Sequence, residues 1–265
     1  SKTGITDIAQ VLSIAYGYHY AHYYFGLNGT KEDEQTEYFS LRSAQCNNLK
    51  AGFESNEDYQ KNQDWYLFEI AANDYMYLMG SNKATRMGKF YNMGEETHYF
   101  KEIYIALQFY FNNSLSSTPH SNVDIDMPQR VEGLAEYYYS FVDEETPEYT
   151  LREAPGSLNM KAKVKSDNTI EITWDTPYTD DNVTYTLVAY NSDGDIVSVV
   201  ETIDSESKGR AVFSPKVQFG ILGDYNRRYI YSFTQDFNDD GIKIFRVIVA
   251  FPDRTVEISE PLIIE

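Results

Sequence analysis

The spacing of hydrophobic residues changes once along the chain, near residue 150, and this change limits the possible folds more than composition does. In the first half, apolar residues recur every three or four positions, which is the spacing of one helix face. In the second half they alternate with polar residues, as in strands with one buried face. We therefore expect a helical domain over 1–145 and an all-β domain over 155–265, joined by an acidic, proline-bearing linker over 146–154.

Four helices are predicted in the first half, over residues 6–25, 65–79, 97–111 and 128–141. Gly26 follows the first and Gly80 follows the second, as is typical where a helix ends. The fourth segment is also compatible with a strand, because it contains three consecutive tyrosines at 137–139. The first domain is therefore expected to be mainly helical.

Alternation in the second half is clearest in three stretches, which are residues 170–174, 185–189 and 245–251. Turn-forming residues separate them, for example at 191–194 and 252–254. About seven short strands within roughly 110 residues are typical of an antiparallel β-sandwich.

The chain is strongly acidic, with 22 Lys and Arg against 41 Asp and Glu, and a formal charge of -19. A surface of this sign repels phosphate groups, so we expect no nucleic-acid partner. No apolar run approaches the roughly 18 residues that cross a bilayer, so we expect no membrane insertion. The single cysteine, Cys46, excludes an internal disulfide. The sequence starts without a Met or a signal peptide, which suggests a processed or truncated chain.

The strands of the second half occur in a recognisable order. Pro155 precedes a strand that ends in Trp174, and the segments 184–187 and 245–247 follow at regular spacing. This order resembles that of a fibronectin type III module. The resemblance covers residues 155–265 and implies a fibronectin- or immunoglobulin-like sandwich, which in secreted proteins is usually a spacer or an adhesive unit.

The first predicted helix has an aromatic-rich sequence, VLSIAYGYHYAHYYF over residues 11–25. It resembles the active-site helix of secreted bacterial gluzincin-like zinc metallopeptidases, which carry an HExxH motif. In that motif two His one turn apart bind zinc, and the Glu between them polarises the attacking water. Aligned on this family, Ile14 takes the place of the first His, Ala15 that of the Glu and Tyr18 that of the second His.

A later segment supports the same resemblance. Residues 68–75, FEIAANDY, are similar to the helix that supplies the third zinc ligand, at Glu69, and residues 128–134 are similar to the segment before an appended module. The resemblance implies a zincin-like N-terminal domain. Such domains normally have a β-sheet before the active-site helix, and only a few residues precede it here. We therefore expect that sheet to be missing or to belong to an upstream part of a longer chain.

The motif positions lack the donor atoms that zinc requires. Ile14 and Ala15 offer none, and a tyrosine such as Tyr18, with a pKa near 10, is a poor ligand at neutral pH. Glu69 alone cannot hold the metal. We therefore predict an inactive relative of the peptidases, with no catalytic residue, no metal and no cofactor.

A shifted ligand set is the alternative. His19 and His22 are three residues apart on the same predicted helix and could share a metal, with Glu69 or His98 as a third ligand. Zinc is the cofactor only under this alternative, which makes the chain an active metallopeptidase. No carboxylate lies between the two His, so a bound metal would lack the usual general base.

The function expected from the sequence is non-catalytic binding, by a bacterial protein that is secreted or displayed on the cell surface. The expected partner is an extracellular protein or a glycan, and the rest of a longer chain is a further candidate. If the cleft of the peptidases persists, Ile14, Ala15 and Tyr18 make it apolar and suited to peptide docking. The alternatives are the zinc peptidase with shifted ligands and a structural spacer within a larger surface protein. The expected class is a multidomain α + β protein.

Overall fold

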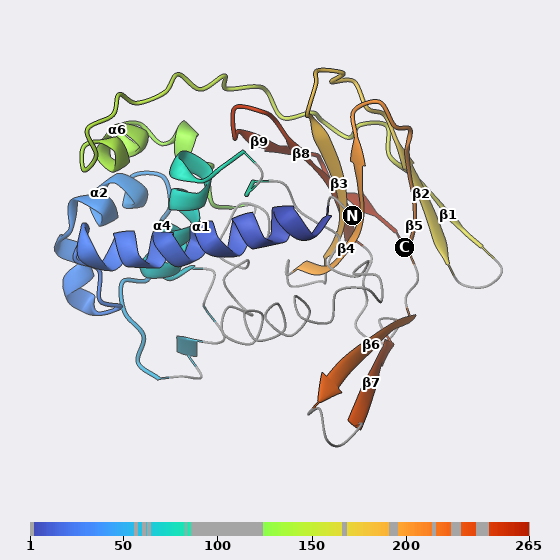
Figure 1. The fold of residues 1–265 in the computed structure, drawn as a ribbon, viewed down its shortest axis with the longest axis horizontal. Coiled ribbons are helices and arrows are strands. Elements are labelled where there is room, and N and C mark those ends of the chain that lie inside the picture. Colours follow the sequence, from blue (N-terminus) through green and yellow to red (C-terminus); the bar gives the residue numbers. More distant parts are fainter. Residues whose placement is uncertain are drawn as a thin grey trace.

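Helices gather on one side of the molecule and sheets on the other (Figure 1). The computed structural model describes residues 3–55, 58–59, 62, 65–82, 84–85, 124–165, 169–190, 196–213, 216–223, 229–236 and 244–264. The helical elements are α1 (Thr3–Tyr23), η1 (Lys31–Gln35), α2 (Glu37–Ser43), α4 (Leu67–Met79), η3 (Pro128–Arg130) and α6 (Leu134–Tyr139). The strands are β1 (Lys161–Val164), β2 (Ile170–Trp174), β3 (Thr184–Tyr190), β4 (Ile196–Asp204), β5 (Gly209–Phe213), β6 (Lys216–Gly223), β7 (Tyr229–Asp236), β8 (Ile244–Ala250), β9 (Val256–Ile258) and β10 (Leu262–Ile263).

The helices α1 and α4 form the centre of the helical side and approach each other closely at Gly17. A Cβ atom at this position would lie 2.2 Å from the carbonyl oxygen of Ala72 on α4, so the crossing requires glycine. Gly80, just after α4, is similarly confined, because an added Cβ would lie 2.9 Å from Ser13 Oγ. These small residues let the two helices bury their apolar faces against each other.

Three of the four predicted helices appear as helical elements. The helices α1 and α4 confirm those predicted over 6–25 and 65–79, with ends that differ by a few residues. The segment 128–141 divides into η3 and α6, because Gly133 has a φ of 78°, which a helix interior does not adopt. The helix predicted over 97–111 lies outside the described residues.

The strands form two antiparallel sheets with a hydrophobic cluster between them. One sheet has the order β1-β2-β5, and the other has the order β10-β8-β3-β4, with β9 also paired to β8. Strands β6 and β7 pair with each other. The cluster includes Ile172 and Trp174 of β2, Leu187 of β3 and Val247 of β8. The alternating residues predicted to be strands are therefore strands with one face turned to this core.

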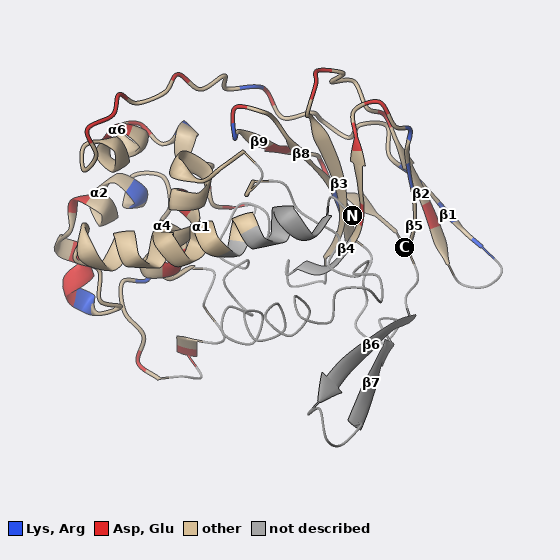
Figure 2. Cartoon of the chain, viewed as in Figure 1, with Lys and Arg blue, Asp and Glu red and all other residues tan. Residues whose placement is uncertain are grey.

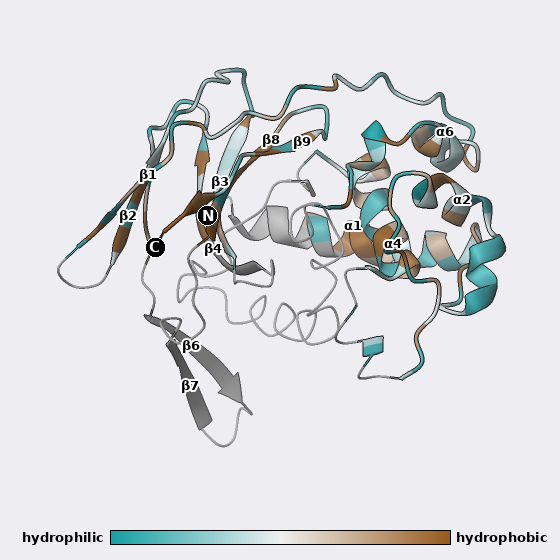
Figure 3. Ribbon diagram, turned by 180° about the vertical axis from the view of Figure 1, so that it is seen from behind, coloured by the Kyte–Doolittle hydropathy of each residue, from teal (hydrophilic) through white to brown (hydrophobic). Residues whose placement is uncertain are grey.

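The helical side and the second sheet share another hydrophobic cluster. It includes Ile14 of α1, Ala72 and Met76 of α4, Val188 of β3 and Ile248 of β8. Every residue of β3 is buried, because this strand contacts the first sheet through one face and the helices through the other. Figure 3 shows hydrophobic stretches, in brown, in both the helices and the strands. The two halves of the chain therefore pack directly on each other.

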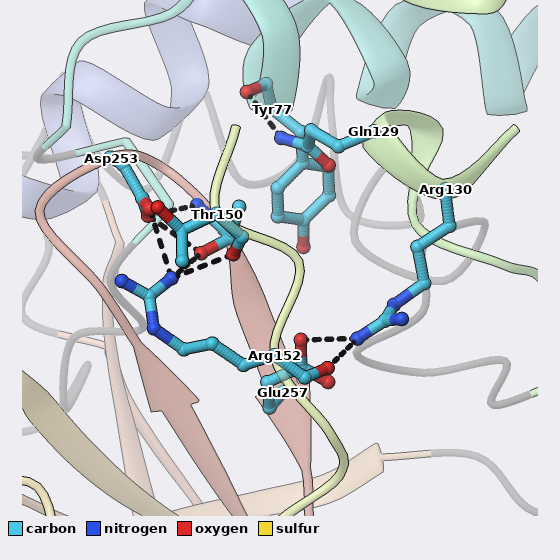
Figure 4. Close-up of polar contacts among 8 residues, drawn as sticks. Tyr77, Gln129, Arg130, Thr150, Arg152, Asp253 and Glu257 are labelled. Atoms are coloured by element: carbon cyan, nitrogen blue, oxygen red, sulfur yellow. Dashed lines mark hydrogen bonds and ion pairs between the residues drawn. The ribbon is translucent and has the colours of Figure 1, made fainter. Parts of the chain in front are cut away.

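Polar contacts join the halves at the edge of this junction (Figure 4). Arg130 donates to Glu257 Oε1 at 2.5 Å and also to the carbonyl oxygen of Arg152. Arg152, in the predicted linker, donates to Asp253 Oδ2 at 2.9 Å and to Thr255 Oγ1 at 2.7 Å. The connecting segment is therefore fixed to the sheet side as well as to the helical side.

The predicted fold class is wrong. We expected a mainly helical, zincin-like N-terminal domain followed by a fibronectin- or immunoglobulin-like sandwich, but the described part of the chain has only four α-helices, together with strands in two antiparallel sheets. In the described part of the first half, α2 has 7 residues and α6 has 6, and turns and irregular backbone lie between the helices. The reason is that helical spacing is sustained only in α1 and α4. The structure combines these helices with two antiparallel sheets.

Acidic residues are frequent along the connecting segments, while α1 and α4 carry few charges (Figure 2). Of the helices that the structure describes, none is both long enough and apolar enough to cross a bilayer.

Candidate functional site

A pocket of about 420 Å³ lies beside α1 and the first turn of α4. Its described lining comes from α1, from positions 28, 29, 53, 59 and 66 that follow it, and from the start of α4. These residues are His22, Asn28, Gly29, Phe53, Tyr59, Tyr66, Phe68 and Glu69. The volume falls within the roughly 300–1,000 Å³ of small-ligand sites. The pocket thus combines aromatic rings with a carboxylate.

Glu69 supplies the carboxylate, and only 4% of its surface is exposed. It lies in the first turn of α4, where the helix dipole stabilises a negative charge. The Tyr18 hydroxyl donates to Oε2 and the Tyr59 hydroxyl donates to Oε1. Since a buried carboxylate is stable only when it is hydrogen-bonded, these two tyrosines fix its position.

Aromatic rings form the walls of the pocket. The ring of Phe53 lies 5.3 Å from that of Tyr59 and 5.8 Å from that of Tyr66, at interplanar angles of 58° and 86°. The rings of Tyr59 and Tyr66 are stacked at 5.4 Å. On the side of α1, Phe68 stacks on Tyr18, also at 5.4 Å. The rings therefore pack against one another, and the Phe53 ring stands at a steep angle to those of Tyr59 and Tyr66.

Asp58 accepts a hydrogen bond from Tyr66, one of the aromatic residues of the pocket wall. The Tyr66 hydroxyl donates to Asp58 Oδ2 at 2.6 Å, and the Lys50 ammonium lies 3.3 Å from Oδ1. The hydrogen bond from Tyr66, together with the Glu54 N–H and Lys50, lowers the pKa of Asp58 to about 2. Burial and the bond to Asp58 raise the pKa of Tyr66. Asp58 is therefore ionised at neutral pH and Tyr66 keeps its proton.

Asp33 fixes another part of the rim. Its carboxylate is almost fully buried and accepts from the Asn28 N–H at 3.1 Å and from the Gly29 N–H at 2.8 Å. Gly29 has a φ of 70°, which a residue with a side chain rarely adopts. The loop that follows α1 is therefore held in one conformation where it lines the pocket.

The structure brings together two of the positions that the sequence singled out. Tyr18 and Glu69, aligned with the second and third ligands of the peptidases, are hydrogen-bonded to each other. Ile14 lies one turn before Tyr18 and is buried in the cluster shared with the sheet, at 2% exposure. Ala15 is half-buried. The Ile14 side chain therefore packs in the hydrophobic core and does not line an open cleft like that of the peptidases.

Of the shifted ligand set, His22 and Glu69 line the pocket and His19 does not. Residues four apart share a helix face, so Tyr18 and His22 are on the face of α1 near Glu69. His19 is displaced from Tyr18 by roughly 100° around the helix. Its exposed ring stacks on Tyr23 at 5.4 Å. The three proposed ligands therefore do not converge.

Other donors do not complete a metal site in the described part of the chain. No group of three His, Cys, Asp or Glu there could hold a metal ion. The Nδ1 atom of His22 lies 3.1 Å from the carbonyl oxygen of Leu27. His98, the other candidate third ligand, lies outside the described residues.

Several pocket residues were missed by the sequence analysis, namely Asn28, Gly29, Phe53, Tyr59, Tyr66 and Phe68. Phe53 lies in an irregular segment and Tyr59 in a short stretch of helical backbone, so spacing gave no indication that their side chains lie near Glu69. The high aromatic content of 15% was the one general signal.

No protein-family model, no curated protein and no solved structure matches this chain.

Proposed function

We propose that the chain is a non-catalytic binding protein, secreted or displayed on a cell surface, and that the pocket beside Glu69 receives part of an extracellular protein or glycan. The arrangement around Glu69 carries this proposal. Aromatic side chains surround a buried carboxylate that two tyrosine hydroxyls hold in a fixed position. Apolar walls with a few placed polar groups are typical of binding pockets.

The same pocket offers little support for catalysis. Its described lining contains no Ser, Thr, Cys or Lys nucleophile. Ala15 stands where the peptidase motif has its general base, and it has no ionisable group. Both oxygens of Glu69 accept hydrogen bonds from phenols. A binding role needs only the aromatic walls and the fixed carboxylate, which the pocket has.

Peptide and glycan arrays probed with labelled protein test the proposal. Phe53 is 47% exposed, so Phe53→Ala removes a pocket wall without opening the core. We expect the wild type to select a defined ligand class and Phe53→Ala to weaken that binding by at least about tenfold, as truncation of an aromatic anchor does. Tyr23→Ala removes another exposed aromatic ring, outside the described lining, and should leave binding unchanged.

Zinc content and peptide cleavage distinguish binding from catalysis. Elemental analysis of the purified chain and a cleavage assay with and without chelator provide the measurements. We expect less than stoichiometric zinc and no chelator-sensitive cleavage. Stoichiometric zinc together with chelator-sensitive cleavage would overturn the proposal, and so would array binding that Phe53→Ala and Tyr23→Ala change equally.

A further inference from the structure

We propose that the outer edge of β1 binds an extended acidic segment of a protein partner, which adds to the sheet as a further strand. No residue of β1 lines the pocket beside Glu69, so the inference goes beyond the proposed function. It depends on the open edge of β1, on the lysine side chains along this strand and on the charge of the sheet face around them.

The strand β1 lies at the end of its sheet and is open to solvent. In the order β1-β2-β5, β2 is the one described strand that pairs with β1. All four residues of β1 are exposed. Figure 1 shows β1 at the outer side of the sheets, away from the helices. A strand in this position presents backbone N–H and C=O groups to which a further strand can bind.

The backbone groups that face away from β2 belong to Ala162 and Val164. The Lys165 N–H donates to the Thr169 carbonyl oxygen at 2.8 Å, so these two residues form a hydrogen-bonded pair where β1 turns into β2. Hydrogen-bonded pairs alternate along an antiparallel ladder, so every second residue before Lys165 also directs its backbone groups toward β2. Ala162 and Val164 lie between these positions. Their N–H and C=O groups therefore point outward, where a partner strand would bind.

The side chains of Lys161 and Lys163 lie on the outer face of the sheet. They are opposite Thr173 and Glu171 of β2, and directly opposite residues share a face. Ile172, between the two β2 residues, is fully buried in the cluster between the sheets. Because successive side chains alternate, Thr173 and Glu171 are on the other face, with the two lysines.

This outer face carries more positive than negative charge. Lys165 and Arg210 of β5 share the carboxylate of Glu171, at nitrogen–oxygen distances of 3.1 and 2.5 Å. Among the ion pairs of the described residues, none includes Lys161 or Lys163. Figure 2 shows basic residues, in blue, along β1. The two lysines are therefore placed to pair with carboxylates of a partner.

The acidic charge of the whole chain does not cancel this local preference. The formal charge of -19 repels an acidic partner at long range. At physiological ionic strength, however, exposed charges more than roughly 8 Å apart are largely screened. The carboxylate of Asp175, just after β2, already accepts a hydrogen bond from Asn159 at 2.6 Å. The lysines of β1 therefore determine which charge is favoured at the edge.

The alternation of β1 defines the sequence that fits. Acidic residues at every second position would face Lys161 and Lys163, and opposite charges across a strand pair stabilise it. The residues between them would lie beside Ala162 and Val164, whose side chains occupy the other face, and 58% of Val164 is exposed. These intervening positions favour small apolar side chains. A second copy of β1 is disfavoured, because it would place lysines opposite lysines.

An acidic glycan fits this surface less well. Its sulfate or carboxylate groups could pair with Lys161 and Lys163, but it has no regular series of N–H and C=O groups for the backbone of Ala162 and Val164. The observations therefore favour an acidic peptide segment, and glycan binding becomes an outcome of the test.

Fluorescence anisotropy of a labelled peptide titrated with the intact chain provides that test. The peptide is Thr-Glu-Val-Glu-Val-Glu-Thr, acetylated and amidated at its ends. Its valines would oppose Ala162 and Val164 and direct their N–H groups toward β1, whereas the N–H groups of the glutamates would face solvent. We expect N-methylation of both valines to weaken binding by at least about tenfold and N-methylation of two glutamates to have little effect. Equal affinities of the two methylated peptides would overturn the inference.

Substitutions locate the binding on β1. The double variant Lys161→Glu with Lys163→Glu should weaken the acidic peptide by at least about tenfold and favour Thr-Lys-Val-Lys-Val-Lys-Thr instead. Ala162→Pro removes an N–H that faces away from β2 and should weaken the acidic peptide by at least about fivefold. Lys31→Glu changes an exposed charge on η1 and should have no effect. Circular dichroism checks that each variant folds, and the methylated peptides test the backbone pairing if Ala162→Pro does not.

The remaining outcomes separate this inference from its rivals. If Lys31→Glu weakens the peptide as much as the double variant does, general charge explains the binding and the inference fails. If heparin binds in a manner that depends on Lys161 and Lys163 while the peptide does not bind, the surface is a glycan site. If Phe53→Ala weakens the peptide, the peptide occupies the pocket, so the inference fails while the proposed function stands.

Discussion

The core around α1 and α4 and the core between the two sheets are built from different kinds of side chain. The helical core buries several tyrosines and a complete ion pair, Arg42 with Asp74, whose side chains are 1% and 2% exposed. Among the described residues, the cluster between the sheets is formed by aliphatic and aromatic side chains. One core therefore depends on directional bonds and the other on shape and area.

Three buried tyrosine hydroxyls of the helical core have a fixed acceptor. Tyr20 donates to the Tyr138 carbonyl oxygen at 2.7 Å, Tyr138 donates to the Ala71 carbonyl oxygen at 2.7 Å, and Tyr38 donates to Asp74 Oδ2 at 2.5 Å. Burial strongly raises the pKa of Tyr138, so its hydroxyl stays protonated. Such a network specifies one arrangement and is sensitive to the loss of any member. We therefore expect the two cores to respond differently to substitution.

The largest effect is expected from Asp74→Leu. It leaves the buried Arg42 guanidinium without its carboxylate, and breaking a buried pair in this way costs about 3–5 kcal/mol in the free energy of unfolding. Urea denaturation followed by circular dichroism measures the loss. The double variant Arg42→Met with Asp74→Leu removes both charges and should recover part of the stability. A loss below about 1 kcal/mol for the single variant would contradict the contrast between the cores.

The next effect is expected from Gly17→Ala. The added methyl group would lie 2.2 Å from the Ala72 carbonyl oxygen, so α1 and α4 must separate, at a cost of about 3 kcal/mol. The change in melting temperature checks this value. Gly26→Asn is the control, because the space around Gly26 is open and Asn tolerates its positive φ of 71°. Equal destabilisation by the two variants would show that the helix crossing is not the cause.

A smaller effect is expected in the sheet core. Leu187→Met conserves volume within the cluster between the sheets and should cost less than about 1.5 kcal/mol. Urea denaturation again measures it, beside Asp74→Leu under the same conditions. A cost as large as that of Asp74→Leu would show that the sheet core is equally intolerant.

The smallest effect concerns Asp58 and acidic pH. Its pKa is lowered from 3.8 to about 2, so its contribution to stability is present above pH 4 and is lost as the pH falls toward 2. Tryptophan fluorescence reports the change, since Trp65 is adjacent to Tyr66. Asp58→Asn should abolish the part of the transition in this pH window. An unchanged transition in the variant would show that other carboxyl groups cause it.

The sequence predicted individual elements better than their assembly. Spacing identified α1, α4 and the strands β2, β3 and β8, because a regular period reports which face of an element is buried. The spacing did not indicate that Val188 and Ile248 share a cluster with Ile14, since the spacing of apolar residues does not reveal which element packs on the buried face of a strand or helix. The fold class failed for this reason, and because α2 and α6 are too short to show a period.

The candidate site was partly predictable. Tyr18 and Glu69 were singled out from two helical segments, and their contact follows from the way in which α1 and α4 cross. The aromatic walls were not predicted, because Phe53 comes from irregular backbone and Tyr59 from a helical stretch too short to show a period. His19 and His22 could be weighed only once the position of each side chain around α1 was known.

The hydrophobic cluster shared by α1, α4 and the second sheet makes the two halves of the chain depend on each other for stability. A fragment that ended near residue 145 would expose Ile14 and Met76 to water, and the complementary fragment would expose Val188 and Ile248. Each such side chain costs about 1.5–3 kcal/mol when exposed. We therefore expect heating to melt the helices and the sheets together in one calorimetric transition, and cleavage of the connecting segment to lower the melting temperature of both.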